Sequence, residues 1–214
     1  MLDLSVVMPC YLGHYPGAAS DRPAKLERAV KSYLDSEGDF TAELVIVADG
    51  CLDTVSEWER RCRALGVDVS ERVLEPVPGR RLRLVEVDKQ PLFSGEVRNA
   101  GIRGAEGEVV AYLDSDDFVM PEHFKAVVAG MRGHDWALFD DILHPCYGRR
   151  AEISFGLCGT STTAHRRDLE ATWPDGYGHD YEFILQLQLL SPHWTHAGPG
   201  GYVVCHVPHL RLNA

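Results

Sequence analysis

Short apolar runs alternate with helical patterns along most of this chain, and this alternation restricts the folds that it can adopt. Apolar side chains recur at the spacing of one helix face in residues 26–34, after Pro23, and in residues 124–131, after Pro121. Less regular helical patterns cover residues 53–65, 96–105 and 180–190. The runs between them have the length of strands covered on both faces, and they fall at residues 2–8, 44–48, 82–87, 109–113 and 136–139. Strands and helices in alternation predict an α/β domain with a mainly parallel central sheet flanked by helices.

The length of 214 residues fits a single domain that buries roughly 70% of its unfolded surface. Residues 142–163 carry scattered glycines and predict a loop or hairpin region, and residues 200–209 predict one more strand. No apolar run approaches the roughly 18 residues needed to span a bilayer. The first residues enter a strand pattern without the basic and apolar segments of a secretory signal, so we expect a cytoplasmic location.

The net charge of the chain disfavours some classes of binding partner. With 21 Lys and Arg against 32 Asp and Glu, the net charge is −11, which disfavours nucleic acids and anionic membrane surfaces. A nucleotide with its own metal remains compatible with this charge. The six cysteines show no Cys-x-x-Cys spacing, so we expect free thiols rather than a zinc site or a redox pair.

The apolar run at residues 109–113 ends abruptly in Asp-Ser-Asp-Asp at residues 114–117. Carboxylates crowded this closely raise one another's pKa unless a cation lies among them, so the pattern suggests a divalent metal bound through oxygen. The alternative is an ordinary turn, in which Asp and Ser bond to nearby backbone groups. Because parallel strands bring their carboxyl ends to one edge of a sheet, residues 9–11 and 49–53 should lie beside these acids.

Five segments carry a family resemblance. They are Ser-Val-Val-Met-Pro-Cys-Tyr at 5–11, Ala-Asp-Gly-Cys-Leu-Asp-Thr at 48–54, Arg-Asn-Ala-Gly-Ile at 98–102, Leu-Asp-Ser-Asp-Asp at 113–117 and Gly-Tyr-Gly-His-Asp-Tyr-Glu-Phe at 176–183. Taken in this order, they resemble the motifs of family 2 glycosyltransferases with the GT-A fold. The resemblance covers nearly the whole chain, and it divides the single domain into a donor half, residues 1–118, and an acceptor and catalytic-base half, residues 119–214.

The resemblance implies which residues bind the nucleotide. Pro9, Tyr11 and Asp49 would contact the nucleoside base, with Asp49 accepting from the imide edge of a uracil. Arg98 would lie near the donor, although an arginine at this position in a helix is more often a solvated charge. An isolated Asp-Gly at residues 49–50 would otherwise be a plain turn.

The resemblance also implies a metal shell for Mn²⁺ or Mg²⁺. Asp116 would be the direct ligand, and Asp114 would bind the ribose or complete the shell. His206, at the end of the last predicted strand, is the candidate third ligand, with His209 and His196 as competitors for that role.

Asp180 is the predicted catalytic base by the same resemblance. In a helix beginning near His179, Asp180 falls on the side of Phe183, Ile184, Leu187 and Leu190, whereas Glu182 points about 200° away toward water. The alternative is that Asp180 caps the helix and complements its dipole. His179 stands where the family usually has an acid, Cys51 replaces the usual serine, and residues 12–22 form a longer insertion.

The implied activity is metal-dependent transfer of a sugar from a nucleoside diphosphate sugar, usually a UDP-sugar, to an acceptor hydroxyl with inversion. The alternatives are a catalytically silent nucleotide-sugar or metal-binding module and a metal-dependent phosphotransferase. A phosphotransferase that uses Asp-x-Asp places it after the first strand, whereas this chain has it after the fourth. The acceptor would be set by residues 142–163, and retention of configuration stays open because the fold hosts both outcomes.

Overall fold

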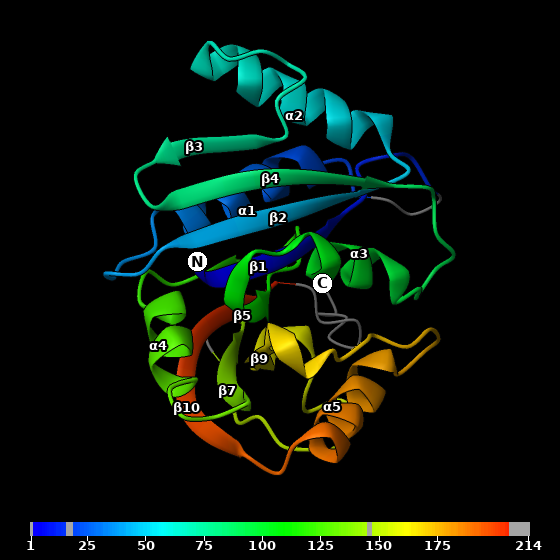
Figure 1. Cartoon of the computed structure of the whole chain (residues 1–214). Helices are drawn as coiled ribbons and strands as arrows, with labels where there is room; N and C mark the ends of the chain where they lie inside the picture. Colours follow the sequence, from blue (N-terminus) through cyan, green and yellow to red (C-terminus); the bar gives the residue numbers. More distant parts are fainter. Residues whose placement is uncertain (1, 16–18, 145–146, 206–214) are drawn as a thin grey trace.

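The computed structural model of the chain describes residues 2–15, 19–144 and 147–205. Its ten described strands form one sheet in the order β3-β4-β2-β1-β5-β9-β7-β10-β6, with β8 paired to β7 (Figure 1). The strands are β1 (Leu2–Cys10), β2 (Ala42–Asp49), β3 (Val73–Val77), β4 (Arg80–Val87), β5 (Gly107–Tyr112), β6 (Phe118–Val119), β7 (Trp136–Leu143), β8 (Tyr147–Arg149), β9 (Thr163–Arg166) and β10 (Trp194–Val204). The helices are α1 (Arg22–Leu34), α2 (Leu52–Leu65), α3 (Glu96–Gly104), α4 (His123–Gly130) and α5 (His179–Leu190), with 3₁₀ turns η1 (Thr160–Thr162) and η2 (Arg167–Leu169).

The predicted parallel block is present. Strands β4, β2, β1 and β5 run parallel side by side, and β7 runs parallel to β10. All five predicted apolar runs coincide with strands, except that Leu113 lies one residue beyond β5. The sequence did not predict β3, β6 or β9, and β9 lies antiparallel between β5 and β7. Strand β8 pairs antiparallel with β7, which agrees with the loop or hairpin expected in residues 142–163. The sheet is therefore mixed outside its parallel block.

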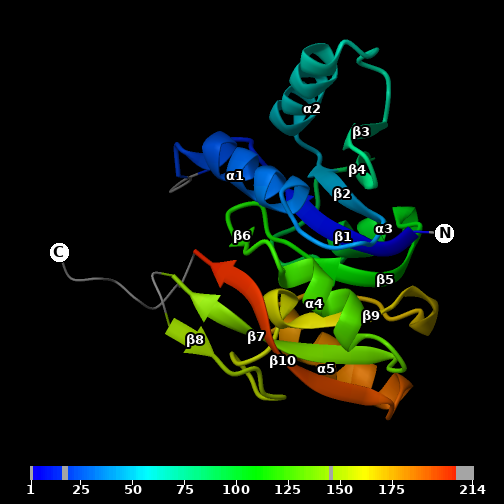
Figure 2. The same ribbon diagram turned by 90° about the vertical axis from the view of Figure 1, so that its left-hand side faces the viewer.

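Helices cover both faces of the sheet (Figure 2). Alternate residues of β1 belong to different cores: Leu4, Val6 and Met8 pack in the cluster that contains residues of α1, α2 and α4, whereas Val7 packs with residues of α3 and α5. A strand buried on both faces has no polar side to show to water, which is why its sequence reads as a continuous apolar run.

The last turn of α5 differs from the prediction that Leu190 faces the core. Phe183, Ile184 and Leu187 are buried as expected, and Glu182 is exposed. Leu190, however, was predicted to face inward and is 47% exposed. The prediction was wrong because the last turn of α5 leaves the core, where Leu189 is 88% exposed.

Five cysteines are described and all are free: Cys10, Cys51, Cys62, Cys158 and Cys205. Within the described ranges, none of the helices has the length and apolar character needed to cross a bilayer.

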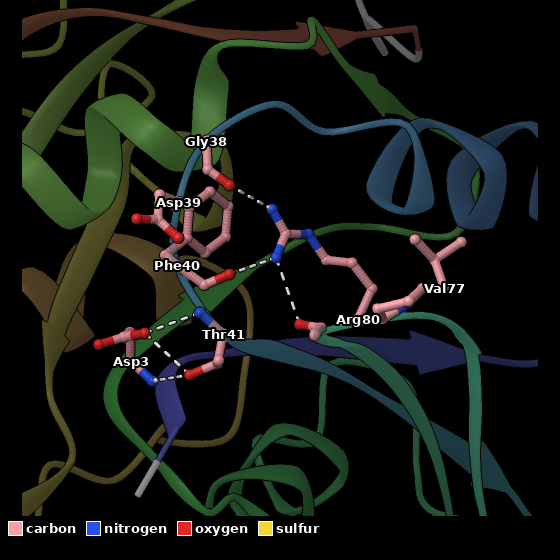
Figure 3. Close-up of a pocket in the computed structure, with 9 residues that line it drawn as sticks. Asp3, Gly38, Asp39, Phe40, Thr41, Val77 and Arg80 are labelled. Carbon is pink, nitrogen blue, oxygen red and sulfur yellow. Dashed lines mark hydrogen bonds between the residues drawn. The ribbon is translucent and has the colours of Figure 1, made fainter.

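A pocket of about 330 Å³ lies at the amino ends of the parallel strands (Figure 3). The buried Arg80 guanidinium donates to the carbonyl oxygens of Phe40 and Gly38, the latter at 3.1 Å, and lies 3.9 Å from the centroid of the Phe40 ring. Asp3 accepts from the backbone N–H and the hydroxyl of Thr41 at 2.7 and 2.8 Å. These bonds hold the segment entering β2, at the edge opposite to the one where the predicted acids lie.

Replacing Gly101 with alanine should destabilise the fold by about 1–3 kcal/mol, because α3 packs so closely on the sheet that overpacking must strain it. A Cβ at Gly101 would lie 2.4 Å from Val7 Cγ1 and 3.0 Å from Val47 Cγ2. This strain should outweigh the gain of about 1 kcal/mol that alanine gives a helix interior. Urea unfolding measures the difference. Gly148→Ala is the control, since a Cβ there meets no atom within 4 Å; equal stability of the parent and Gly101→Ala would contradict the close packing.

Candidate functional site

The predicted site residues that follow strands β1, β2 and β5 lie at one edge of the sheet. Strands β1, β2, β4 and β5 are parallel, and their pairing places Cys10 opposite Ala48, Asp49 opposite Val87 and Val7 opposite Tyr112. Their carboxyl ends therefore lie side by side, and the loops that follow them form the candidate active site. Ligands in open α/β sheets bind at this edge.

Asp49 is 9% exposed at the end of β2, and both of its carboxylate oxygens have partners. Lys89 Nζ donates to Oδ2 at 2.6 Å, and the backbone N–H of Gln90 donates to Oδ1 at 2.7 Å. The same ammonium lies 4.6 Å from the centroid of the Tyr11 ring. The structure thus brings together Tyr11, which follows Pro9 at the end of β1, and Asp49, with a cation between them. Lys89 was not among the predicted residues.

The loop after β1 is held by one arginine. The Arg22 guanidinium donates to the carbonyl oxygens of Tyr11, Leu12 and Gly13 at 2.8, 3.0 and 2.6 Å. Cys51, which stands in place of the family's usual serine, accepts at Sγ from the backbone N–H of Gly13 at 3.0 Å. The first residues of the insertion are therefore fixed beside the end of β1 rather than left as an unconstrained surface loop.

The segment Arg-Asn-Ala-Gly at residues 98–101 opens α3 and has three structural roles. Arg98 Nη2 donates to Asp114 Oδ1 at 3.1 Å. The side-chain amide of Asn99 pairs with the backbone of Trp173, through bonds of 2.9 and 2.7 Å. Gly101 lets the helix approach Val7. The Arg98 side chain is only 14% exposed, so it is part of the site and not a solvated charge.

Asp114 is fixed by three groups from distant segments. Besides the Arg98 bond, Thr160 Oγ1 donates to Asp114 Oδ2 at 3.0 Å. The backbone N–H of Asp114 donates to the hydroxyl of Tyr202 at 2.9 Å. Asp114 is therefore oriented before any ligand arrives.

Asp117 is the most buried acid of this turn, at 4% exposure. It accepts from the Tyr202 hydroxyl at 2.9 Å and from the Cys205 backbone N–H at 2.7 Å. Burial, together with the negative charges of Asp114 and Asp116, raises the pKa of Asp117 to about 7. The turn holds more negative charge than its environment stabilises, which is the condition that favours binding of a cation.

The other predicted metal ligands have different outcomes. Asp116 is half-buried in the same turn, and its backbone carbonyl accepts from Arg28. His206 and His209 lie outside the described residues. His196 lies near the beginning of β10, where Nε2 bonds to Asp140 Oδ1 at 2.6 Å, so the structure places it with Asp140 and away from the acidic turn. Over residues 2–15, 19–144 and 147–205, no three His, Cys, Asp or Glu side chains are grouped to hold a metal.

Asp180 lies in the first turn of α5 and packs closely against Gly159. A Cβ added at Gly159 would lie 3.3 Å from Asp180 Cγ. Asp180 Oδ1 is shielded, 3.5 Å from His179 Nε2, and has no hydrogen-bond partner among the described residues, although the side chain as a whole is 45% exposed. Burial raises the pKa of Asp180; Arg98 and His179 oppose that shift, and Asp114 adds to it. The helix is capped by Gly178 without a side-chain bond, so Asp180 is not the cap, but as an acid in the first turn it does complement the helix dipole.

Trp173 packs between Arg98, which bonds to Asp114, and helix α5, which carries Asp180. Its ring lies 5.0 Å from the Arg98 guanidinium carbon and stacks on Phe183 of α5 at a centroid distance of 4.0 Å. Its indole N–H donates to the Tyr112 hydroxyl at 2.9 Å, and that hydroxyl lies 2.7 Å from His165 Nε2. Burial lowers the pKa of His165 to about 4, so this histidine is neutral.

Sequence reasoning missed Lys89, Thr160, Trp173 and Tyr202. A signal existed for Lys89, which follows the predicted strand at 82–87 just as the predicted acids follow theirs. The other three carry no local signal, because their partners lie 46 to 88 residues away in the chain.

The chain was compared with known proteins. The family model described as "Glycosyl transferase family 2" matches residues 5–178. The succinoglycan biosynthesis protein ExoO of Rhizobium meliloti (strain 1021) is 33% identical over 111 residues, which are 52% of this chain and 27% of that protein. The putative glycosyltransferase EpsH of Bacillus subtilis (strain 168) is 32% identical over 81 residues, 38% of this chain and 19% of that protein.

Solved structures share the fold at low sequence identity. TarS 1-349 of S. aureus superimposes with a TM-score of 0.70 at 17% identity, covering 95% of this chain and 60% of that one. The mannosyltransferase PcManGT of Pyrobaculum calidifontis, solved with GDP-Man and Mn²⁺, gives a TM-score of 0.65 at 16% identity, covering 97% and 58%. The chain thus spans less than two thirds of the length of these relatives.

Tyr202→Phe should lower the free energy of unfolding by about 1–3 kcal/mol, because it leaves the buried Asp114 N–H and Asp117 carboxylate without a shared partner. Tyr147→Phe, at a tyrosine that is 68% exposed, is the matched control and should be neutral. Chemical denaturation of the two variants in the presence of a chelator measures both values. Identical losses in both variants would show that the phenol does not hold the turn.

Proposed function

We propose that this chain, which belongs to glycosyl transferase family 2, is a glycosyltransferase that moves the sugar of a UDP-sugar to an acceptor hydroxyl with inversion. It would use a divalent metal at Asp116, with Asp180 as general base. One observation carries this proposal. Two consecutive residues contact the proposed donor-side acid and the proposed base: Thr160 bonds to Asp114, and Gly159 packs against Asp180. The proposed donor half, residues 1–118, and the acceptor half, residues 119–214, meet at this point.

The donor side is proposed from the residues at the ends of β1 and β2. Pro9 and Tyr11 would contact the nucleoside, and Asp49 would accept from the imide of uracil. Because Lys89 and Gln90 occupy the Asp49 carboxylate, the base would have to share or displace the Lys89 bond. Structures of TarS 1-349 with UDP-GlcNAc and with UDP support a uridine donor, whereas the GDP-Man complex of PcManGT is the competing precedent.

The residues present fit a Mg²⁺ or Mn²⁺ that is bound largely by the donor. Such ions take oxygen ligands and often use one or two carboxylates together with substrate phosphates and water. Asp116 would be the direct protein ligand, with Asp114 in its shell, and His206 is the proposed further ligand because its neighbour Cys205 bonds to Asp117. When bound, the ion would supply positive charge to the departing diphosphate.

Asp180 is proposed to take the proton. The acceptor oxygen would attack the anomeric carbon as the bond to the diphosphate oxygen breaks, and the hydroxyl proton would pass to the Asp180 carboxylate. Arg98 would hold Asp114 in place during this step. General-base assistance of this kind contributes roughly 10²–10⁴ in rate. A catalytically silent module would bind the same donor without turnover, and a phosphotransferase would release phosphate. The cytoplasmic location stays a prediction from the sequence.

A thermal-shift panel of UDP, GDP, UDP-GlcNAc and GDP-Man, with and without Mn²⁺, tests the donor site. A ligand at about 100 times its Kd adds roughly 2.7 kcal/mol, which is about 5–11 °C for a domain of this size. Asp116→Ala should lose the Mn²⁺-dependent part of the shift, since it removes the proposed ligand. Asp39→Ala, at an exposed acid on the opposite edge of the sheet, should keep it. Uniform absence of shifts, or Mn²⁺ dependence retained in Asp116→Ala, would refute the site.

Asp180→Asn should bind donor like the parent but lose about 10²-fold or more of its transfer rate. The base works only in its ionised form, and its pKa is raised. On lowering the pH, the transfer rate should therefore begin to decrease at a higher pH than it would with an ordinary aspartate. His179→Gln should move this decrease to a still higher pH, since His179 lowers the pKa of Asp180. Glu182→Gln, on the exposed side of the helix, is the control. Full turnover in Asp180→Asn would remove it as the base.

A further inference from the structure

Exposed aromatic side chains gather around the beginning of α5. Phe93, Phe155 and Tyr177 are 45%, 59% and 72% exposed, and Tyr181 is half-buried. Their ring centroids are spaced at 5.8 Å (Phe93–Tyr177), 6.1 Å (Phe155–Tyr177) and 6.3 Å (Phe155–Tyr181). These four residues, called the aromatic rim below, come from three segments of the chain: the loop before α3, the loop after β8, and the residues that lead into and begin α5.

The Phe93 backbone indicates that the rim is held in place. Phe93 has φ +61°, a conformation that costs a bulky residue free energy unless its surroundings impose it. Its carbonyl oxygen accepts from the Gly176 N–H at 2.9 Å and from His179 Nδ1 at 3.2 Å. Asp175 in turn accepts from the Ser94 hydroxyl and the Gly95 N–H, at 3.0 and 2.8 Å. The loop before α3 and the turn before α5 are therefore bonded to each other at Phe93 and at the two residues that follow it.

The rim borders the proposed base. A Cβ added at Gly178 would lie 2.9 Å from Phe155 Cε2, so this ring rests on the backbone immediately before α5. The His179 ring lies 6.2 Å from the Phe93 ring, and His179 Nε2 is 3.5 Å from Asp180 Oδ1. A molecule lying on the rim would thus have its edge next to Asp180.

The chemistry of this surface selects among acceptors. Large aromatic side chains left exposed together mark a binding surface rather than a random feature of a protein exterior. Aromatic faces carry partial negative charge and attract the C–H groups along one face of a sugar ring, while its hydroxyl groups project from the edge. Asp175 and Asp180 border the rim, and their negative charge disfavours an acceptor that carries a phosphate.

We propose that the aromatic rim is the acceptor subsite and that the acceptor is a carbohydrate, whose terminal sugar ring packs on Phe155 and Tyr177 and presents a hydroxyl to Asp180. This inference rests on the proposed function, because it takes Asp180 as the group that receives the proton. It identifies the acceptor class from side chains that lie outside the donor edge.

Saturation-transfer-difference NMR can test the subsite with methyl β-D-glucopyranoside, cellobiose and N,N′-diacetylchitobiose, in the presence of UDP and Mn²⁺. A threonine-containing peptide and octyl phosphate represent the other acceptor classes. At least one saccharide should receive saturation from the parent protein, and neither of the other probes should. Phe155→Ala and Tyr177→Ala should each weaken that saccharide's binding by about 10-fold, as expected for loss of a stacked aromatic ring. Leu189→Ala, at an 88% exposed side chain at the far end of α5, should not.

Transfer kinetics give a second measurement. With whichever donor shifts the melting temperature of the parent, the rim variants should raise the KM for the saccharide while changing kcat much less. No saccharide signal from the parent, binding within about twofold of the parent in both rim variants, or a stronger signal from the peptide or octyl phosphate would overturn the inference. The donor thermal shift of the parent separates the two proposals: if it is present while the rim variants behave like the parent, only the acceptor inference fails.

Discussion

The candidate site depends on the buried hydroxyl of Tyr202. This phenol accepts from the Asp114 backbone N–H and donates to the Asp117 carboxylate, so one oxygen fixes both ends of the acidic turn after β5. Tyr202 lies on β10, and the sheet order places two strands, β9 and β7, between β10 and β5. The turn that would face the donor is thus built by both halves of the chain, and the first half alone would leave Asp114 and Asp117 without this partner.

The charge of the candidate site favours the binding of a cation. Asp114 and Asp116 raise the pKa of Asp117, Asp114 also raises the pKa of Asp180, and Arg98 bonds to Asp114. The pKa of Asp117 rises to about 7 and the pKa of Asp180 is also raised, so the protein alone does not stabilise all of these charges. A diphosphate on its own would add to the repulsion, whereas a diphosphate with its metal relieves it.

The parts of the fold that could be predicted are those encoded locally. The parallel strands were visible because strands buried on both faces need continuous apolar runs, and the acids stood out because they follow such a run directly. Strand β9, Thr-Ala-His-Arg, has no such pattern and exists because β5 and β7 pair with it. Lys89 and Tyr202 reach the site through bonds between residues 40 to 88 apart in the chain, which periodicity does not register. The helix period predicted that Leu190 faces inward, but the core ends before this residue and its side chain is exposed.

Packing around Trp173 links the donor edge to the acceptor side. Arg98 lies over one part of this ring, Phe183 of α5 stacks on it, and Asn99 holds its backbone. A change in the position of α5 would therefore move Trp173 and with it Arg98, which orients Asp114. The aromatic rim, by contrast, belongs to loops whose rings are largely exposed. With the rim as the proposed acceptor subsite, substitutions of its exposed rings would change acceptor binding while leaving this core intact.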